Sequence, residues 1–225
     1  MTELTGAELA ALQNSQLFEG LSGGALARAL DFFGASLADV PRGGFLAHPG
    51  EPLRFFGLVI EGSVQVSMLD LSGEEAILAG VGPGETFGEA LCFLEVPDIP
   101  VFIRAAEDTR LLRLRCERVK ECTRDENACA LTGRFIAMLA QRTLHMNSRI
   151  QILSKKSLRE KLVLFFTDCA RQAGGSEFNV PFDRAGMAVY LGADRSALSR
   201  ELSRLRREGR IEYHKNHFRL CTPRK

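Results

Sequence analysis

Apolar residues in the last third of the chain recur at helical spacing in two short segments separated by a glycine. The first segment places three of them on one face, namely Met187, Ala188 and Leu191. Gly192 follows, and Asp194 is a residue type that commonly caps the start of a helix. The second segment has leucines at intervals of four and three residues, namely Leu198, Leu202 and Leu205. This pattern predicts two amphipathic helices joined by a tight turn.

The opposite face of the second helix is polar and basic. We expect it to expose Arg195, Ser196, Ser199, Arg200 and Arg204. Two short runs of alternating character then flank Lys215 and Asn216 and predict a β-hairpin, from which Lys215 and Arg219 would bind phosphates. These features are typical of a winged helix-turn-helix whose second helix enters the major groove of DNA. The alternative is an ordinary helical hairpin with a solvated basic face.

Charge is divided unevenly along the chain. Residues 154–225 contain 16 Lys and Arg against 8 Asp and Glu, whereas residues 1–153 contain 13 against 20. The net charge of +1 therefore combines a basic C-terminal part with an acidic N-terminal part. This asymmetry predicts double-stranded DNA as the partner of the basic part and a different task for the acidic part.

The N-terminal part changes character near residue 45. We expect the first forty residues to be helical, with an apolar face formed by Leu9, Leu12, Leu17, Phe18, Leu21, Leu26 and Leu30. Between residues 45 and 114, short apolar runs alternate with regularly spaced glycines, namely Gly50, Gly62, Gly73 and Gly84. Short strands between glycine turns are typical of a sandwich or barrel, and we interpret this region as a β-roll.

Residues 126–153 predict one long helix with a narrow apolar stripe. Its members alternate at spacings of three and four and are Ile136, Leu139, Thr143, Met146, Ile150 and Leu153. On a heptad, β-branched residues occupy position a and Leu or Met position d, which favours a parallel two-stranded coiled coil and thus a homodimer. Packing of the helix on its own domain is the alternative. Ser157 and Glu160 form a capping box that begins another helix, running through Phe166, so we expect a hinge between residues 153 and 157.

These patterns predict an α+β chain with three parts. Residues 1–125 form a β-roll with N-terminal helices, residues 126–153 a dimerisation helix, and residues 154–225 a winged helix-turn-helix DNA-binding domain. At 225 residues the chain is long enough for two hydrophobic cores. Without a long apolar run or a signal-peptide pattern, we expect no membrane partner and a cytoplasmic protein with reduced cysteines. Common catalytic motifs are absent, so we do not expect an enzyme.

In this order the motifs resemble the CRP/FNR family of bacterial transcription regulators along nearly the whole chain. The resemblance rests on the recognition helix and on the segments LFEGL (17–21), IEGSV (60–64), PGETFGE (83–89) and REKL (159–162). It implies a homodimer in which residues 1–125 are an effector-sensing, cyclic-nucleotide-binding-like domain. An effector bound between the roll and the long helix would reorient the DNA-binding domains. RNA polymerase is a further candidate partner.

The effector pocket departs from the family pattern. In members that bind cyclic nucleotides, an Arg-Ser pair after the Gly-Glu motif holds the cyclic phosphate, but the matching positions here are Ile99 and Pro100. An anionic phosphate would lose its guanidinium partner, so we expect an effector other than cyclic AMP, either a small molecule or a redox signal. The candidate effector-binding residues are Phe87, Gly88, Glu89, Leu91, Ile99, Val101 and Arg104. Alternatively the apolar ones are ordinary core, and Arg104 pairs with Glu89.

The cysteines do not identify a cofactor. FNR-type members bind an iron–sulfur cluster through several N-terminal cysteines, but no cysteine precedes Cys92, so no such cluster is expected. No C-x-x-C motif is present, and no metal site is expected. Cys122 and Cys129 flank a charged segment and are candidates for a redox pair, with small buried hydrophobes as the alternative. His48 and His145 are lone histidines, so haem is not expected.

The resemblance also bears on DNA sequence. An Arg at the place of Arg200 commonly contacts guanine, a pairing that contributes about 1–3 kcal/mol of discrimination. Arg195 contacts either a base or a phosphate. Ser196 stands where relatives often have Glu, so we expect an unusual half-site within a palindromic operator, with half-sites about 10–10.5 bp apart. The alternative function is a ligand-binding signalling module that acts through protein contacts.

Overall fold

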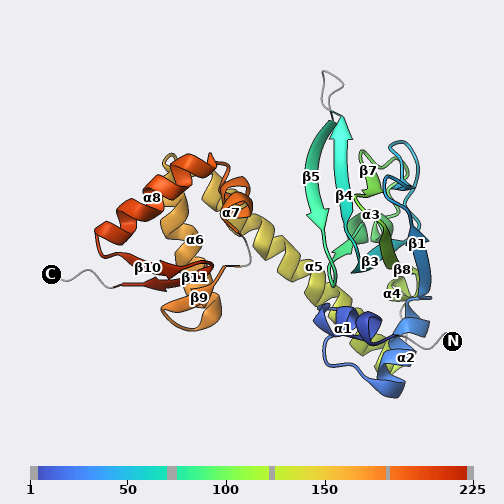
Figure 1. Ribbon diagram of the computed structural model, residues 1–225. Helices are drawn as coiled ribbons and strands as arrows, with labels where there is room; N and C mark the ends of the chain where they lie inside the picture. The colour runs from blue at the N-terminus through green and yellow to red at the C-terminus, as the bar shows by residue number, and fades with distance from the viewer. Residues whose placement is uncertain (1–4, 70–74, 122–124, 181–182, 222–225) are drawn as a thin grey trace. The chain divides into compact units, whose positions relative to one another are not determined.

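The computed structural model describes residues 5–69, 75–121, 125–180 and 183–221 and divides into two units (Figure 1). We call Met1–Gln141 the N-terminal unit and Arg142–Lys225 the C-terminal unit. The boundary falls inside α5 (Glu126–Leu153), so the long helix expected from the sequence contributes residues to both units. No helix in the described part of the chain is long and apolar enough to cross a membrane.

Two helices begin the N-terminal unit, α1 (Gly6–Asn14) and α2 (Gly23–Phe32). A capping box starts α1, in which the Thr5 hydroxyl accepts from the Glu8 N–H and the Glu8 carboxylate accepts from the Thr5 N–H at 2.6 Å. The buried Glu8 carboxylate also accepts from Arg110 of β8 (Thr109–Leu114) at 2.8 Å. The Thr5 N–H lowers the pKa of Glu8, so this carboxylate is charged when it joins α1 to the sheet.

Two four-stranded antiparallel sheets follow, which confirms the predicted β-roll. The first has the order β1 (Ser36–Val40), β8, β3 (Phe56–Glu61) and β6 (Thr86–Phe87). The second has the order β2 (Phe45–Ala47), β7 (Phe102–Ala105), β4 (Val64–Leu69) and β5 (Glu75–Val81).

The expectation that the first forty residues are helical is wrong from Ser36 onward, because residues 36–40 form β1. This strand pairs with β8, from Ser36 opposite Arg113 to Val40 opposite Thr109. The partner strand is distant in sequence, and this tertiary pairing decides the conformation of the segment.

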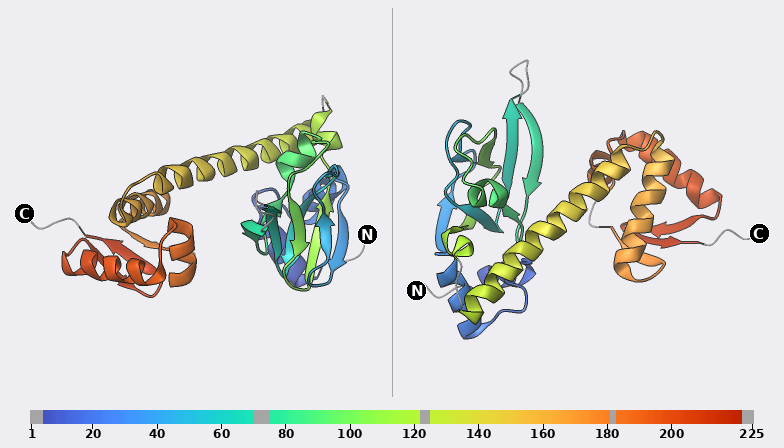
Figure 2. Two further views of the ribbon diagram at one scale, coloured as in Figure 1. Left: turned by 90° about the horizontal axis from the view of Figure 1, so that it is seen from above. Right: turned by 180° about the vertical axis from the view of Figure 1, so that it is seen from behind.

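Buried apolar residues form two clusters in the N-terminal unit. One joins α1, α2 and the first part of α5 to the first sheet and centres on Phe33, whose ring packs against Phe18, Phe56 and Phe135 at 5.9–6.3 Å between centroids. The right-hand view of Figure 2 shows these helices together. The other cluster fills the space between the two sheets and includes Val59, Val64, Phe87, Ile103 and Leu111. Two short helices, α3 (Glu89–Phe93) and α4 (Glu117–Lys120), complete this unit.

The C-terminal unit contains α6 (Leu158–Ala173), α7 (Arg184–Leu191) and α8 (Arg195–Arg207). Its three-stranded sheet has the order β10 (Ile211–His214), β11 (His217–Leu220) and β9 (Glu177–Asn179). The ring of Phe166 on α6 packs against Phe178 at 5.8 Å and Phe218 at 4.7 Å, measured between centroids. These contacts join the helices to the sheet in a core separate from that of the N-terminal unit.

The start of α6 agrees with the sequence prediction, whereas its end does not. Ser157 and Glu160 form the predicted capping box. The helix runs past Phe166 to Ala173 and ends where Gly174 adopts a left-handed conformation, with φ of 68°. The Gly174 N–H bonds to carbonyls of the last turn, the usual termination at a glycine.

Candidate nucleic-acid interface and sensor residues

α8 presents two faces of opposite character. Leu198, Leu202 and Leu205 are buried in the core of the C-terminal unit. The predicted contact residues on the other face are all exposed, namely Arg195, Ser196, Ser199, Arg200 and Arg204. The row of leucines fixes the helix on its core, so the polar side chains are held facing solvent.

The connection between α7 and α8 is the predicted glycine turn. Gly192 has φ of 58°, and its N–H bonds to the carbonyls of Ala188 and Val189. Asp194 occupies the N-cap position of α8, although it makes no capping hydrogen bond to the described residues of that helix. The side chain that does cap is Asp183, which accepts from the Gly186 N–H at 2.7 Å and starts α7.

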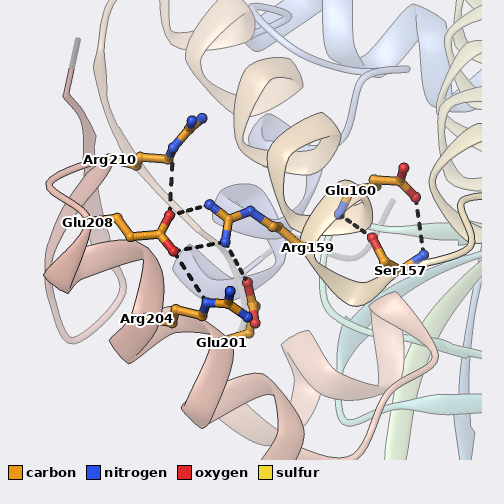
Figure 3. A network of polar contacts seen from close by, with 7 residues as sticks. All are labelled: Ser157, Arg159, Glu160, Glu201, Arg204, Glu208 and Arg210. Carbon is orange, nitrogen blue, oxygen red and sulfur yellow. Dashed lines mark hydrogen bonds and ion pairs between the residues drawn. The ribbon is translucent and has the colours of Figure 1, made fainter. Parts of the chain in front are cut away.

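Arg159 of α6 holds the C-terminal end of α8 (Figure 3). Its guanidinium donates two hydrogen bonds to the Glu208 carboxylate and lies 3.5 Å from the Glu201 carboxylate. Arg204 and Arg210 approach Glu208 at 3.2 and 3.7 Å. The hydrogen bonds from Arg159 lower the pKa of Glu208 to about 2. Glu208 is therefore charged at neutral pH and joins three arginines around the end of the recognition helix.

The predicted wing is present as the hairpin of β10 and β11, in which Ile211 pairs with Leu220 and His214 with His217. Lys215 lies in the two-residue turn with φ of 51° and is exposed. Arg219 is also exposed, and its guanidinium lies 3.4 Å from the Glu177 carboxylate.

Arg184 of α7 packs against the wing, a role that sequence analysis missed. Its guanidinium lies 4.9 Å from the ring centroid of Tyr213 and 5.1 Å from that of Phe218. It also donates to the Lys215 carbonyl at 3.0 Å. Cation–π contacts and this hydrogen bond fix the turn that carries Lys215. In the sequence Arg184 is only one more basic residue at a helix start, so no local signal reveals the contact.

The candidate effector residues lie mainly in the core of the roll. Phe87, Ile99 and Val101 are buried between the sheets, and Leu91 is half-buried against the same cluster. Arg104 forms an ion pair at 3.2 Å with Glu75, a different carboxylate from the Glu89 that the sequence suggested as its partner.

The Gly-Glu motif starts α3. Gly88 has φ of 78°, and a Cβ atom there would lie 2.5 Å from the Cδ2 atom of Leu53, so the position requires glycine. Glu89 is buried and accepts a hydrogen bond from the Thr86 hydroxyl. The same hydroxyl lies 3.7 Å from the sulfur of Met138 on α5. Thr86 thus connects the motif to the first part of the long helix.

The predicted redox pair cannot be placed, because Cys122 lies outside the described residues, and Cys129 is exposed. A different pair is close in space. Cys92 and Cys116 are both buried and line one pocket of about 390 Å³. Sequence analysis missed them because the roll brings together two segments that are far apart in the chain. Among the described residues, no group of three His, Cys, Asp or Glu is arranged to hold a metal ion.

The predicted dimerisation stripe on α5 is largely open to solvent. Ile136, Met146 and Ile150 are 57%, 60% and 62% exposed. Thr143 and Leu153 are also exposed, whereas Leu139 is partly buried against the core of the N-terminal unit. A row of exposed apolar side chains on one helix is a surface that another apolar surface can cover.

The two units and their exposed basic helix define a class of protein, the DNA-binding transcription regulators with a ligand-binding domain. Residues 37–126 match the cyclic nucleotide-binding domain family, and residues 160–225 match the Crp-like helix-turn-helix domain family. The chain belongs to the CRP/FNR family of bacterial transcription regulators.

Individual relatives agree with this assignment. The cyclic AMP receptor protein of Thermus thermophilus is 29% identical over 198 residues, which cover 88% of each chain. The nitrogen fixation regulation protein FixK of Rhizobium meliloti is 27% identical over 154 residues, covering 68% of this chain and 67% of FixK. The crystal structure of DNR from Pseudomonas aeruginosa has a TM-score of 0.52 at 25% identity and covers 98% of this chain and 96% of DNR. The curated relatives are transcription regulators and not enzymes.

Proposed function

We propose that the protein is a homodimer that binds a palindromic operator and is switched by an effector other than cyclic AMP. The observation that carries the proposal is the geometry of α8. Its leucines are buried, while Arg195 and Arg200 are exposed near its N-terminal end and form no ion pair with any described residue. Guanidinium groups held in this way are available for guanine bases and phosphates.

Selection of binding sites from random double-stranded DNA tests the proposal. We expect a palindrome with half-sites about one helical turn apart, 10–10.5 bp. Arg200→Ala is expected to lose about 1–3 kcal/mol of discrimination at one base pair, which is roughly fivefold to 150-fold in relative affinity. Arg171→Ala removes the same charge from an exposed position on α6 and should keep the sequence preference.

Two further outcomes of this assay are informative. Cyclic AMP added to the binding reaction should leave the affinity unchanged, because the core position Ile99 offers no cation to a phosphate. A selection that yields no preferred sequence would contradict operator binding and favour a signalling module that acts through protein contacts.

The homodimer is supported by the exposed stripe on α5. Ile150→Asp would place two carboxylates inside the proposed coiled coil, and burial of unpaired charges costs several kcal/mol. We therefore expect this variant to sediment as a monomer in analytical ultracentrifugation, where the unmodified protein sediments as a dimer. Val163→Asp alters an exposed valine on α6, outside the stripe, and should leave the dimer intact. A dimeric Ile150→Asp variant would show that subunits associate through a different surface.

A further inference from the structure

A pocket in the N-terminal unit brings together two cysteines that the DNA-binding function does not use. Cys92 lies on α3, and Cys116 lies between β8 and α4. Both belong to one buried apolar cluster, with exposed fractions of 5% and 2%. Both also line the pocket of about 390 Å³, whose remaining wall includes Arg54, Glu95 and Lys120. The pocket gives a small reagent a route to otherwise buried sulfur atoms.

The surroundings make the two thiols unequal. A hydrogen bond from the Cys116 thiol lowers the pKa of Cys92, and burial and the negative charge of Glu117 oppose this shift. The Cys116 backbone N–H and the positive charge of Lys120 also lower the pKa of Cys92. The contact with Cys92 and burial raise the pKa of Cys116. A thiol whose ionisation is favoured by a neighbouring thiol that keeps its proton is the arrangement of an attacking and a resolving cysteine.

We propose that Cys92 and Cys116 form a dithiol switch that a hydroperoxide oxidises to a disulfide. The Cys92 thiolate attacks the terminal oxygen of the hydroperoxide, the O–O bond breaks, and the alcohol or water leaves after taking up a proton. Cys92 is then a sulfenic acid. The Cys116 sulfur attacks the Cys92 sulfur, an S–S bond forms, and the hydroxyl group leaves as water with the Cys116 proton. Two thiols are oxidised and one hydroperoxide is reduced.

The disulfide would connect two functional segments of the unit. Cys92 is on the short helix that begins at the Gly-Glu motif, and Cys116 follows β8 directly before α4. Bond formation would fix the sulfur atoms about 2.05 Å apart and tie α3 covalently to the segment that follows β8. This constraint on α3 would reach α5 through Glu89, Thr86 and Met138. Control of DNA binding by this switch rests on the function proposed above, whereas the thiol chemistry does not.

The experiment uses the full chain with Cys122 and Cys129 replaced by serine, which removes the other closely spaced pair. The protein is treated with hydrogen peroxide, alkylated in denaturant and examined by intact mass and peptide mapping. We expect each oxidised chain to carry two alkyl groups fewer than the reduced control and to yield a peptide that links Cys92 to Cys116, and we expect dithiothreitol to reverse the change. In the Cys116→Ser variant, oxidation should stop at a sulfenic acid on Cys92, which dimedone labels. Cys169→Ser is the matched control and should oxidise normally, because burial raises the pKa of that thiol to about 11.

Several results would overturn the inference. In the unmodified chain, full alkylation of Cys92 and Cys116 after peroxide has oxidised the exposed Cys129 would exclude the switch. Equal dimedone labelling of Cys92→Ala and Cys116→Ser would show that Cys92 is not the attacking thiol. Binding to the selected operator separates the two proposals. A disulfide that leaves affinity unchanged refutes control of DNA binding, whereas reduced protein that binds no operator refutes the proposed function.

Discussion

The C-terminal and N-terminal units place their candidate functional side chains in opposite ways. Arg195, Arg200 and Lys215 project into solvent from elements whose backs are buried. The candidate effector residues Phe87 and Ile99 are themselves part of the core. Substitution of an exposed contact residue therefore removes an interaction with DNA at little cost in stability. Substitution in the sensor region disturbs packing before it alters any ligand contact. Substitutions can therefore separate function from stability in the C-terminal unit, whereas in the N-terminal unit they affect both.

The largest effect should come from a core residue in each unit, and it should stay within that unit. Phe166→Ala and Phe56→Ala each remove a fully buried ring, for an expected loss of about 3–5 kcal/mol. The chain has two tyrosines and no tryptophan, and Tyr190 and Tyr213 both lie in the C-terminal unit. Tyrosine fluorescence during urea unfolding therefore reports on that unit alone. Phe166→Ala should shift this transition and Phe56→Ala should not. Equal shifts would show that the units unfold as one.

A smaller loss is expected at the Gly-Glu motif. Gly88→Ala combines left-handed backbone with a Cβ atom 2.5 Å from Leu53, and such strain costs about 1–3 kcal/mol. The loss should appear in circular dichroism of thermal unfolding, with the tyrosine transition unchanged. Gly24→Ala, in the exposed first turn of α2, meets only the end of the Arg28 side chain and should be neutral or stabilising by up to about 1 kcal/mol. If Gly88→Ala were as stable as Gly24→Ala, packing would not constrain the Gly-Glu motif.

The smallest effect is electrostatic and depends on pH. Because the pKa of Glu208 falls from 4.5 to about 2 on folding, the charged carboxylate contributes stability above pH 4.5. That contribution is lost as the pH falls through this interval toward about 2. Arg159→Met should reduce this acid-dependent loss and move the pKa of Glu208, followed by NMR, back toward 4.5. Arg171→Met removes an exposed arginine from the same helix and should leave the Glu208 titration in place. An unchanged titration in Arg159→Met would assign the shift to the other arginines.

The parts of the molecule that sequence analysis predicted are those that depend on local pattern. Leu198, Leu202 and Leu205 repeat at helical spacing, so both the buried and the exposed face of α8 follow from one helix. The glycine turn and the capping box at Ser157 are equally local, and both are present. The resemblance to the CRP/FNR family supported the predicted order of roll, long helix and DNA-binding domain along the chain.

The parts that sequence analysis missed depend on contacts between distant segments. β1 is a strand because β8 pairs with it. Arg184 stacks on rings of the wing, and Arg159 bonds a carboxylate at the far end of α8. Cys92 and Cys116 come together only when the roll folds. The pair predicted from the sequence, Cys122 and Cys129, rests on short spacing along the chain. No spacing rule within a single element encodes such pairs.

The middle of α5 has a consequence for how much active protein a cell contains. Residues 140–147 are all exposed, and they span more than two turns of the helix. An isolated stretch of this kind is only marginally helical in water. In the proposed homodimer a second chain would order it, so that association and helix formation proceed together and follow the protein concentration. The rate of synthesis of the regulator would then act as an input beside its effector, and promoters would respond to abundance with a threshold.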